Sequence, residues 1–363
     1  MVVMALDHVR DYFHFSAVQG ADPLDLTRTT PAIFLTRLVT HFCAPIFSFL
    51  AGISVYLAIK RGKPRNLLSG FLIKRGLWLI FLELTVLMWF GWAFNVDLRL
   101  YFFATLWALG WSMIVLAGLI HVPFRVVAVF SAVLILGHNA LDGIKPETWG
   151  AWHWVWRFLH VSSVFETKSG FTIYAFYPLI PWLGVMSAGY CFGRLYDLEA
   201  GSRQRRLLWL GFGALAAFVL LRASNTYGNL TPWVAQPNPV FTALSFLDVT
   251  KYPPSLCYLL LTLGAGLVLL SVFERWNPRW IQPLLAFGRV PFFYYILHIP
   301  LIHGLAWLTN VLRFGRGDFS PVGGTPPPAA GFSLLTTYAV WAAIVLALYP
   351  ACRWFRSEER RVG

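Results

Sequence analysis

The chain has 363 residues, of which 58% are hydrophobic and 12% charged, and its formal net charge at pH 7 is +13. A soluble domain carries about 25% charged residues, so this composition excludes an ordinary soluble protein, which would need a charged surface. Apolar runs of about 20 residues are long enough to cross a bilayer core. We therefore predict an all-α fold, a polytopic transmembrane helical bundle that forms a single domain over residues 1–363.

Hydrophobic runs predict about ten membrane-spanning segments. Their approximate ranges are 1–17, 31–59, 67–93, 100–120, 123–141, 171–193, 207–223, 253–273, 284–312 and 331–353. The first run has no basic flank before it, and 15 residues of helix cover only about 22 Å. We therefore expect the first helix to be truncated at its start.

Basic stretches set the predicted orientation. "KRGKPR", "SRQRR", "ERWNPR" and "CRWFRSEERR" follow the second, sixth, eighth and tenth segments. Lys and Arg collect in cytoplasmic loops, so we place these stretches and both termini in the cytoplasm and expect no nucleic-acid partner. The connections 18–30, 142–170, 224–252 and 313–330 then lie on the outer side. Trp and His residues in 142–170 are either interface anchors or part of a substrate-facing surface.

The first segment is unusual because it combines apolar residues with ionisable ones. Four of them recur at i, i+3, i+4 and i+7: Asp7, Arg10, Asp11 and His14. That spacing predicts one polar helix face, and His8 lies about 100° around the helix from Asp7. Charges within a bilayer are costly and normally face a bundle interior. The segment therefore predicts one wall of a polar cavity.

Other predicted spans add polar groups at similar depth. Arg37 and His41 lie one helical turn apart, as do Tyr294 and His298, and His303 follows beyond Pro300. Asp248 and Lys251 lie at the outer boundary of the eighth segment. Histidine exchanges protons near neutral pH and can act as a nucleophile. Hydrogen bonding to a neighbouring helix is the alternative role for each histidine.

Several site classes lack their motifs. The sequence contains no zinc-ligand spacing, P-loop, nucleophile elbow or dinucleotide-binding fingerprint, so no metal is expected. The four cysteines fall in or at the ends of apolar runs and predict buried side chains. Three functions remain open: an enzyme, a proton-coupled transporter that uses the His/Asp/Arg cluster, and a structural membrane subunit.

Five stretches carry a family resemblance. "MVVMALDHVRDYFHF", "THFCAPIFSFLAGIS", "YPLIPWLGVMSAGYCFGRLY", "FLDVTKYPPSLCYLLLTLG" and "FGRVPFFYYILHIPLIH" together resemble bacterial relatives of heparan-α-glucosaminide N-acetyltransferase. The resemblance implies a polytopic acyltransferase of the bacterial inner membrane. Such enzymes pass an acetyl group from cytosolic acetyl-CoA to an amino sugar or other glycan acceptor beyond the membrane. The expected partners are the lipid bilayer, the acyl donor and the acceptor, and a homodimer stays open.

The resemblance also implies site residues. The family assigns catalysis to a histidine near the outer end of the first helix, with an assisting polar residue that matches His8. "HFCAP", with His41 and Pro45, resembles the family's "Asp-x-x-Phe-Pro". The usual "His-x-x-Trp-x-Gly" is absent, and His14 is the nearest candidate for its histidine.

These matches predict a division of roles within the site. Either His8 or His14 accepts the acetyl group or acts as general base, and Asp7 or Asp11 orients it. The remaining catalytic candidates are His41 and His298. Acetyl-CoA phosphates would meet Arg75, Arg194 and Arg289. The predicted substrate-binding residues are Arg10, Arg37, Asp248, Lys251, Tyr294 and His303.

Overall fold

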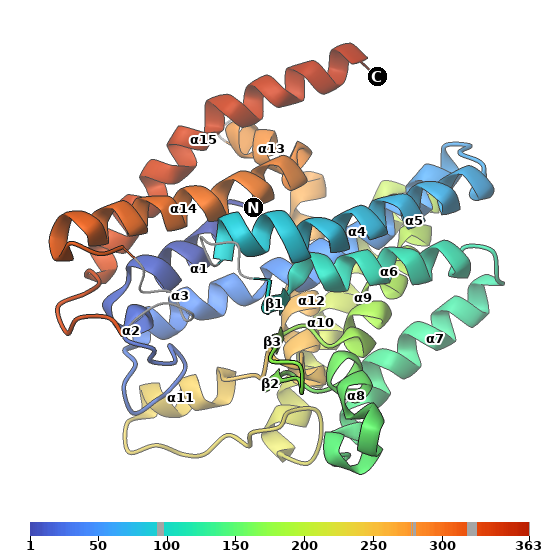
Figure 1. Cartoon of the computed structure of the whole chain (residues 1–363). Helices are drawn as coiled ribbons and strands as arrows, with labels where there is room; N and C mark the ends of the chain where they lie inside the picture. Colours follow the sequence, from blue (N-terminus) through green and yellow to red (C-terminus); the bar gives the residue numbers. More distant parts are fainter. Residues whose placement is uncertain (93–97, 277, 279–280, 318–324, 363) are drawn as a thin grey trace. The chain divides into compact units, whose positions relative to one another are not determined.

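The structure is a computed structural model of the chain (Figure 1) and describes residues 1–92, 98–276, 278, 281–317 and 325–362, with side chains to residue 358. Parts of the predicted connection 313–330 and of the basic stretch "ERWNPR" fall outside these residues. The described residues are mostly helical, and they include six long apolar helices and little sheet. The prediction of an all-α polytopic membrane protein is confirmed.

The chain divides into two compact units. Unit 1 comprises Met1–Cys43, Thr85–Asp97 and Asn277–Gly363, and unit 2 comprises Ala44–Leu84 and Leu98–Trp276. Unit 1 contains α1 (Val2–Phe13), α2 (Phe15–Val18), α3 (Pro31–His41), α13 (Gln282–Arg289), α14 (Pro291–Phe314) and α15 (Leu334–Val362). The π-helical segment η1 (Glu83–Trp92) connects unit 2 to unit 1. That residues 1–363 form one domain stays a prediction.

Unit 2 contains most of the secondary structure. Its elements are α4 (Cys43–Lys60), α5 (Arg65–Leu82), β1 (Leu100–Phe103), α6 (Thr105–Leu119), α7 (Phe124–Gly137), η2 (His138–Leu141), η3 (Pro146–Trp152), α8 (His153–Leu159), β2 (Ser163–Glu166), β3 (Thr172–Ala175), α9 (Leu179–Phe192), η4 (Gly193–Asp197), α10 (Ala200–Ser224), α11 (Pro239–Leu247) and α12 (Leu256–Arg275). Within this unit α10 packs on α12, α5 on α6 and α7 on α9.

Six described stretches are long and apolar enough to cross a membrane: Pro31–Lys60, Phe124–Leu141, Ala200–Ser224, Leu256–Arg275, Pro291–Phe314 and Leu334–Glu358. Each falls on one of the ten predicted segments. The other four segments contain shorter α-helices, namely α1, α5, α6 and α9. Of these, α5 has 18 residues and continues into the π-helical η1.

A small sheet shortens two predicted helices. Strand β3 pairs parallel with β1 and antiparallel with β2, in the order β1–β3–β2. The predicted segments 100–120 and 171–193 therefore begin as strands, and α6 and α9 start only after them. Aromatic side chains cover the sheet, where Phe102 stacks on Tyr174 with ring centroids 4.5 Å apart. Aromatic residues favour strands, and hydropathy alone did not separate them from helix.

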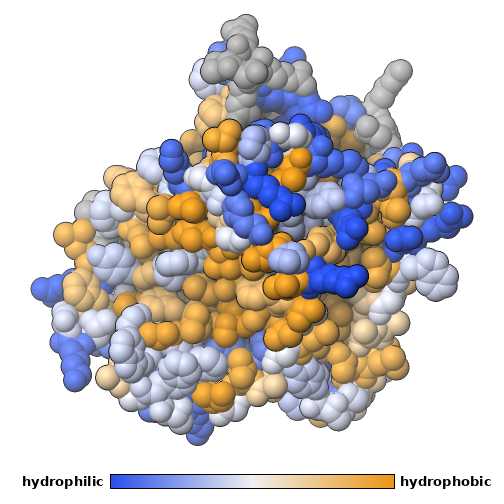
Figure 2. All heavy atoms as spheres, turned by 90° about the vertical axis from the view of Figure 1, so that its right-hand side faces the viewer, coloured by the Kyte–Doolittle hydropathy of each residue, from blue (hydrophilic) through white to orange (hydrophobic). Residues whose placement is uncertain are grey.

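The outer helix faces of unit 2 are apolar. Large exposed side chains include Phe71 and Trp78 on α5, Val133 on α7, and Trp209 and Leu220 on α10. Figure 2 shows apolar side chains gathered over much of the face that it presents. A soluble protein rarely exposes an apolar area of this kind, whereas lipid contact accounts for it.

Two buried ionisable side chains in unit 2 form hydrogen bonds with backbone groups. Glu83 is fully buried, and its Oε2 accepts a hydrogen bond from the Leu106 backbone nitrogen at 2.6 Å, at the start of α6. Arg222 on α10 is 2% exposed and donates to four backbone carbonyls: those of Thr231, Ser245, Phe246 and Asp248. A carboxylate suits a helix N-terminus, and the fork of an arginine can gather several carbonyls. Both residues therefore order the ends of helices and connections.

In unit 1, α1 packs against α3, α14 and α15. Its apolar contacts include Ala5 and Val9, both fully buried, together with Tyr294 on α14. The indole of Trp341 on α15 donates to the Val2 carbonyl at 2.9 Å. Helix α3 begins after Thr30, whose side chain caps it, with Pro31 in the first turn. The surrounding helices thus fix one side of α1 in a buried setting.

Candidate active site in unit 1

His14 lies at the C-terminal end of the first helix. Helix α1 ends at Phe13, and His14, with φ −74° and ψ 133°, is its C-cap and still donates from its backbone nitrogen to the Arg10 carbonyl at 3.0 Å. The chain turns away after His14, because the Phe15 backbone nitrogen donates to the Phe332 carbonyl at 2.9 Å and the Phe332 backbone nitrogen donates to the Phe13 carbonyl at 2.7 Å. Asp7, Arg10 and Asp11 lie within the helix, and that all four residues share one face stays a prediction.

Asp7 is the centre of a buried ion cluster. Arg10 donates to Asp7 Oδ1 at 3.0 Å, and Arg37 from α3 donates to Asp7 Oδ2 at 2.5 Å. The Thr40 hydroxyl also donates to Asp7 Oδ1, at 2.9 Å. Three donors on one carboxylate join α1 to α3, and Asp7 is therefore better suited to hold the helices together than to orient a histidine.

Asp11 is the carboxylate that faces His8. The two side chains approach to 3.9 Å between His8 Nδ1 and Asp11 Oδ2, and Arg10 donates to Asp11 Oδ1 at 2.6 Å. The His8 ring also meets Trp92 edge-on, with centroids 5.2 Å apart, and lies 5.3 Å from the ring of His298. His8 thus lies between a carboxylate on its own helix and a second imidazole on α14.

The backbone determines which nitrogen of His298 carries the proton. Nδ1 lies 3.0 Å from the Tyr294 carbonyl and 2.8 Å from the Tyr295 carbonyl. Because carbonyls only accept, Nδ1 donates, and Nε2 keeps the lone pair in the neutral ring. Among the described residues, neither His298 Nε2 nor the Tyr294 hydroxyl has a hydrogen-bond partner, and both residues are 0% exposed.

The other two histidines of unit 1 are also buried. His303 on α14 donates from Nδ1 to the Gly91 carbonyl at 2.7 Å and stacks on Tyr12 with centroids 4.6 Å apart. His41 is 1% exposed and is the last residue of α3. Pro300 does not interrupt α14, which runs from Pro291 to Phe314. The structure thus brings together His8, His298, Asp11 and the Asp7 cluster.

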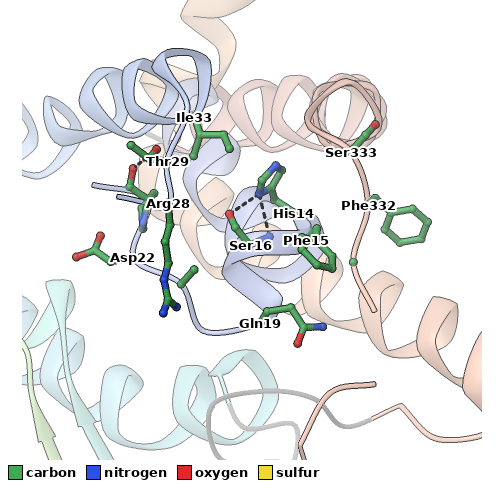
Figure 3. A pocket seen from close by; sticks show the side chains of 13 residues that line it. His14, Phe15, Ser16, Gln19, Asp22, Arg28, Thr29, Ile33, Phe332 and Ser333 are labelled. Carbon is green, nitrogen blue, oxygen red and sulfur yellow. Dashed lines mark hydrogen bonds between the residues drawn. The ribbon is translucent and has the colours of Figure 1, made fainter. Parts of the chain in front are cut away.

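A pocket of about 660 Å³ opens next to the end of α1 (Figure 3). Its lining comes from residues 14–33 and from residues 331–333, which all belong to unit 1. The lining combines aromatic Phe15 and Phe332 with polar Gln19, Asp22 and Arg28. This volume falls in the range of small-molecule sites, about 300–1,000 Å³. An aromatic ring beside hydrogen-bonding groups suits a sugar-sized polar ligand.

His14 lines this pocket. Its Nδ1 lies 2.8 Å from the Ser16 hydroxyl and 3.3 Å from the Ser16 backbone nitrogen, as the dashed lines in Figure 3 mark. When Nδ1 donates to the hydroxyl, Nε2 keeps the lone pair and is the ring nitrogen left for a ligand. Among the described residues no carboxylate bonds to His14, so Ser16 holds the ring where a triad would use an acid.

Charged groups at the pocket come from the connection 18–30. Arg28 has a largely exposed side chain and forms an ion pair with Asp25 at 3.9 Å. Hydrogen bonds from the Thr27 hydroxyl and backbone lower the pKa of Asp25, which therefore stays ionised at neutral pH. Asp22 accepts from the Leu24 backbone nitrogen at 2.9 Å. These local bonds give the connection a defined turn beside the pocket.

Gly331 offers a test of how the pocket is built. Its φ of +97° is unfavourable for other residues, and a Cβ there would lie 2.5 Å from the Phe15 Cα atom. We expect Gly331→Val to separate residues 331–333 from residues 13–15 and to lower the activity of the protein about tenfold or more, because the site is misplaced. The measurement is the activity of purified protein that is monodisperse in detergent and obtained in the same yield as the wild type.

The matched control is Gly201→Val. Gly201 lies on α10, has no positive φ, and has open space around a Cβ. Gly201→Val is expected to keep the wild-type rate. A Gly331→Val protein as active as Gly201→Val would contradict the close packing of residues 331–333 against residues 13–15.

Four predicted site residues belong to unit 2. Arg75 on α5 is half-buried, and Arg194 on η4 is exposed with its guanidinium 4.9 Å from the Phe124 ring centroid. Asp248 follows α11, where its carbonyl accepts from Arg222, and Lys251 is 8% exposed beside the Tyr252 ring. The third predicted donor-binding arginine, Arg289, is exposed at the end of α13 in unit 1.

Several site residues were missed from the sequence. Thr40 lies three residues after Arg37, so helical spacing could have placed it beside Asp7. Ser16, Asp22 and Arg28 fall in an irregular connection where no periodicity predicts a common pocket. Residues 331–333 contribute through a contact more than 300 positions away in sequence, which no local pattern reveals.

No group of three or more His, Cys, Asp or Glu side chains suited to a metal occurs in the part of the chain that the structure describes. The described cysteines are all free thiols. That the protein needs no metal stays a prediction. The groups that the described site offers are imidazole, carboxylate and guanidinium groups.

Comparison with known proteins identifies the family. Residues 13–226 match the family model described as heparan-alpha-glucosaminide N-acetyltransferase, catalytic. A search of curated proteins and a search of solved structures each found no match. The matched range covers more than half of the 363 residues and includes His14 and most of the pocket. Together with its six candidate spans, this match shows that the chain is an integral membrane protein of the heparan-alpha-glucosaminide N-acetyltransferase catalytic family.

Proposed function

We propose that this membrane acetyltransferase moves an acetyl group from cytosolic acetyl-CoA to an amino sugar or other glycan acceptor at the outer face. The family match supports the reaction class. The observation that carries the finer proposal is the pocket of about 660 Å³ that His14 lines at the end of the first helix. In the orientation predicted from the basic stretches, that end of α1 is the outer one.

The acceptor would bind in this pocket. Phe15 is 51% exposed there and offers a ring face to a sugar, while Gln19 and Asp22 offer hydrogen-bonding groups. His14 would act as general base in the tautomer whose Nδ1 donates to the Ser16 hydroxyl, because Nε2 then keeps its lone pair for the proton of the acceptor amine. Of the two candidates that the sequence left open, His8 and His14, this proposal assigns the general base to His14, the nearest candidate for the family's catalytic histidine.

The donor would arrive from the cytoplasmic face. The exposed Arg289 of unit 1 is a proposed phosphate contact, and the exposed Arg194 and half-buried Arg75 of unit 2 each stay a separate prediction of such a contact. The acetyl thioester would meet His8, whose side chain is 15% exposed and faces Asp11. Asp11, rather than Asp7, is the proposed partner, because Asp7 already accepts from Arg10, Arg37 and Thr40.

These residues supply a balanced acid–base reaction. The amine nitrogen forms a bond to the acetyl carbon, and the carbon–sulfur bond breaks. His14 takes a proton from the amine, and His8 gives a proton to the departing CoA thiolate. One amide and one CoA thiol form, and later proton exchange with water restores both histidines.

The proposed setting is the bacterial inner membrane, with both termini in the cytoplasm. The lipid bilayer covers the apolar helix faces of Figure 2, and the small-molecule partners are acetyl-CoA and the glycan acceptor. The basic stretch that ends the chain supports the cytoplasmic C-terminus through the positive-inside rule.

The test uses purified full-length protein in liposomes with acetyl-CoA labelled in the acetyl group. Release of free CoA and labelling of glucosamine are followed together. Acceptor-dependent CoA release with labelled N-acetylglucosamine is the expected result. Absence of both acetyl-CoA binding and turnover would reject the acetyl-CoA proposal, and solute flux without a covalent product would indicate the proton-coupled transporter.

A further inference from the structure

The imidazole of His298 in unit 1 has a lone pair on Nε2 that no described residue contacts with a donor. The carbonyls of Tyr294 and Tyr295 hold Nδ1 of His298, so the lone pair of Nε2 is fixed in direction along with the ring. In the described part of the chain nothing donates to this atom, and the residue is 0% exposed. A buried acceptor without a donor is unfavourable, unless the atom receives a proton or a hydrogen bond at some stage.

The neighbouring group that can supply a donor is His8. The two ring centroids are 5.3 Å apart at an interplanar angle of 52°. At this spacing, rotation of the His8 side chain brings an N–H within hydrogen-bond distance of His298 Nε2. The two rings can form this hydrogen bond directly, with no molecule bound between them. His298 is therefore able to act on His8 without touching a substrate.

Exposure increases from His298 to Asp11. The His298 side chain is fully buried, that of His8 is 15% exposed, and that of Asp11 is 42% exposed. A protonated His8 carries two N–H groups. It can donate one to His298 Nε2, while the other, on Nδ1, faces the Asp11 carboxylate at 3.9 Å, beyond hydrogen-bond distance. The acceptor and the nearby carboxylate both favour the imidazolium form of His8, and the N–H on Nδ1 is the one left to be given to a leaving group.

We propose that His298 is a positioning residue for His8: its Nε2 accepts a hydrogen bond from the His8 ring and holds His8 protonated, ready to give its proton to the leaving thiolate. This inference rests on the proposed acetyl transfer and adds a residue from α14 to it. The sequence motif on the first helix does not contain this residue, and the matched family range ends before it.

Other charged groups near the pair have their own roles. The titratable and charged side chains on the packed elements are Asp7, Arg10 and Asp11 on α1, Arg37 and His41 on α3, Tyr294 and His303 on α14, and Cys352 on α15. The amino group of Met1 also acts electrostatically on His298. Arg10 is shared between Asp7 and Asp11, so its charge is already balanced within α1.

The experiment compares His298→Leu with His298→Gln. Leucine removes the acceptor, whereas glutamine keeps an acceptor oxygen. In His298→Leu we expect kcat to fall about 10²-fold, as for loss of acid–base function, with KM for acetyl-CoA and glucosamine unchanged. The alkaline limb of the kcat profile should move to lower pH, because His8 loses its proton more easily. His298→Gln should restore most of the wild-type profile.

Ile302→Ala separates this role from loss of stability. Ile302 is fully buried on the same helix and has no polar atom. The Ile302→Ala substitution should lower the melting temperature without moving the pH profile of kcat. A His298→Leu protein with the wild-type profile, or with only a KM effect, would overturn the proposal while leaving acetyl transfer intact.

A second measurement does not depend on activity. In protein labelled with ¹⁵N at histidine, the ring signals report which nitrogens carry protons. The wild type and His298→Gln should both show His8 protonated to a higher pH than in His298→Leu. Equal titration of His8 in all three proteins would overturn the proposal even if the proposed reaction were absent.

Discussion

Replacement of His14 by alanine is expected to lower kcat/KM for acetyl transfer about 10³-fold, the middle of the range for loss of a general base. His14 is the histidine that lines the pocket, and its backbone and Nδ1 are both fixed, by Phe332 and Ser16 respectively. The side chain is 6% exposed and caps the short helix α2. The measurement is the rate of acceptor-dependent CoA release by protein in liposomes.

Two comparisons make this result specific. His121→Ala changes an exposed histidine between α6 and α7 and should keep the wild-type rate. His8→Ala should also reduce the rate, since it removes the proposed proton donor. If His14→Ala and His8→Ala both retained full activity, the proposed roles of these two histidines would be wrong.

Replacement of Asp7 by asparagine is expected to destabilise the protein by about 3–5 kcal/mol, the cost of removing one partner of a buried ion pair. Arg10 is 2% exposed and Arg37 is 12% exposed at the side chain, so both would keep buried charge with less compensation. The Thr40 hydroxyl would also lose its charged acceptor. Thermal unfolding in detergent should show a clearly lower melting temperature.

The control is an exposed ion pair. Arg157 and Glu147 meet at 3.0 Å, but the Glu147 side chain is 69% exposed, and solvent weakens such pairs. Glu147→Gln should therefore leave the melting temperature nearly unchanged. Equal stability of the Asp7→Asn and Glu147→Gln proteins would show that the Asp7 cluster does not hold α1 to α3.

The double variant Asp7→Asn/Arg37→Gln refines this prediction. Removing both a charge and its counter-charge avoids the unpaired arginine, and we expect it to recover part of the lost stability. The interaction free energy from the double-mutant cycle should exceed about 0.5 kcal/mol, as for residues in direct contact. Additive effects on the free energy of unfolding would mean that the contribution of Arg37 to stability does not depend on Asp7.

The spacing of ionisable residues on the first helix predicted most of its polar cluster. Helical geometry places Asp7, Arg10 and Asp11 within reach of each other whatever surrounds them, because i, i+3 and i+4 positions share a face. His14 follows the same spacing as the helix C-cap and still donates to the Arg10 carbonyl, but the chain leaves the helix after it, since Phe332 pairs with the backbones of Phe13 and Phe15. A sequence pattern has no information about that competing partner.

The site illustrates the same limit at longer range. The sequence predicted His8 and His298 as members of one polar cavity from their depth. It did not predict that the carbonyls of Tyr294 and Tyr295 fix the His298 ring, because this depends on the rotamer adopted on α14. Nor did it divide the roles of Asp7 and Asp11, which only the position of α3 decides.

The sequence by itself determined that this is a helical membrane protein, because low charge and long apolar runs leave the bilayer as the compatible solvent for its surface. It also determined the family, through residues that lie in order along the chain. Tertiary structure alone decided where α1 ends, which carboxylate is free to face His8, and that residues 14–33 and 331–333 enclose a pocket. The physical reason is that composition and periodicity act locally, whereas hydrogen bonds between distant segments choose among conformations that are locally similar in energy.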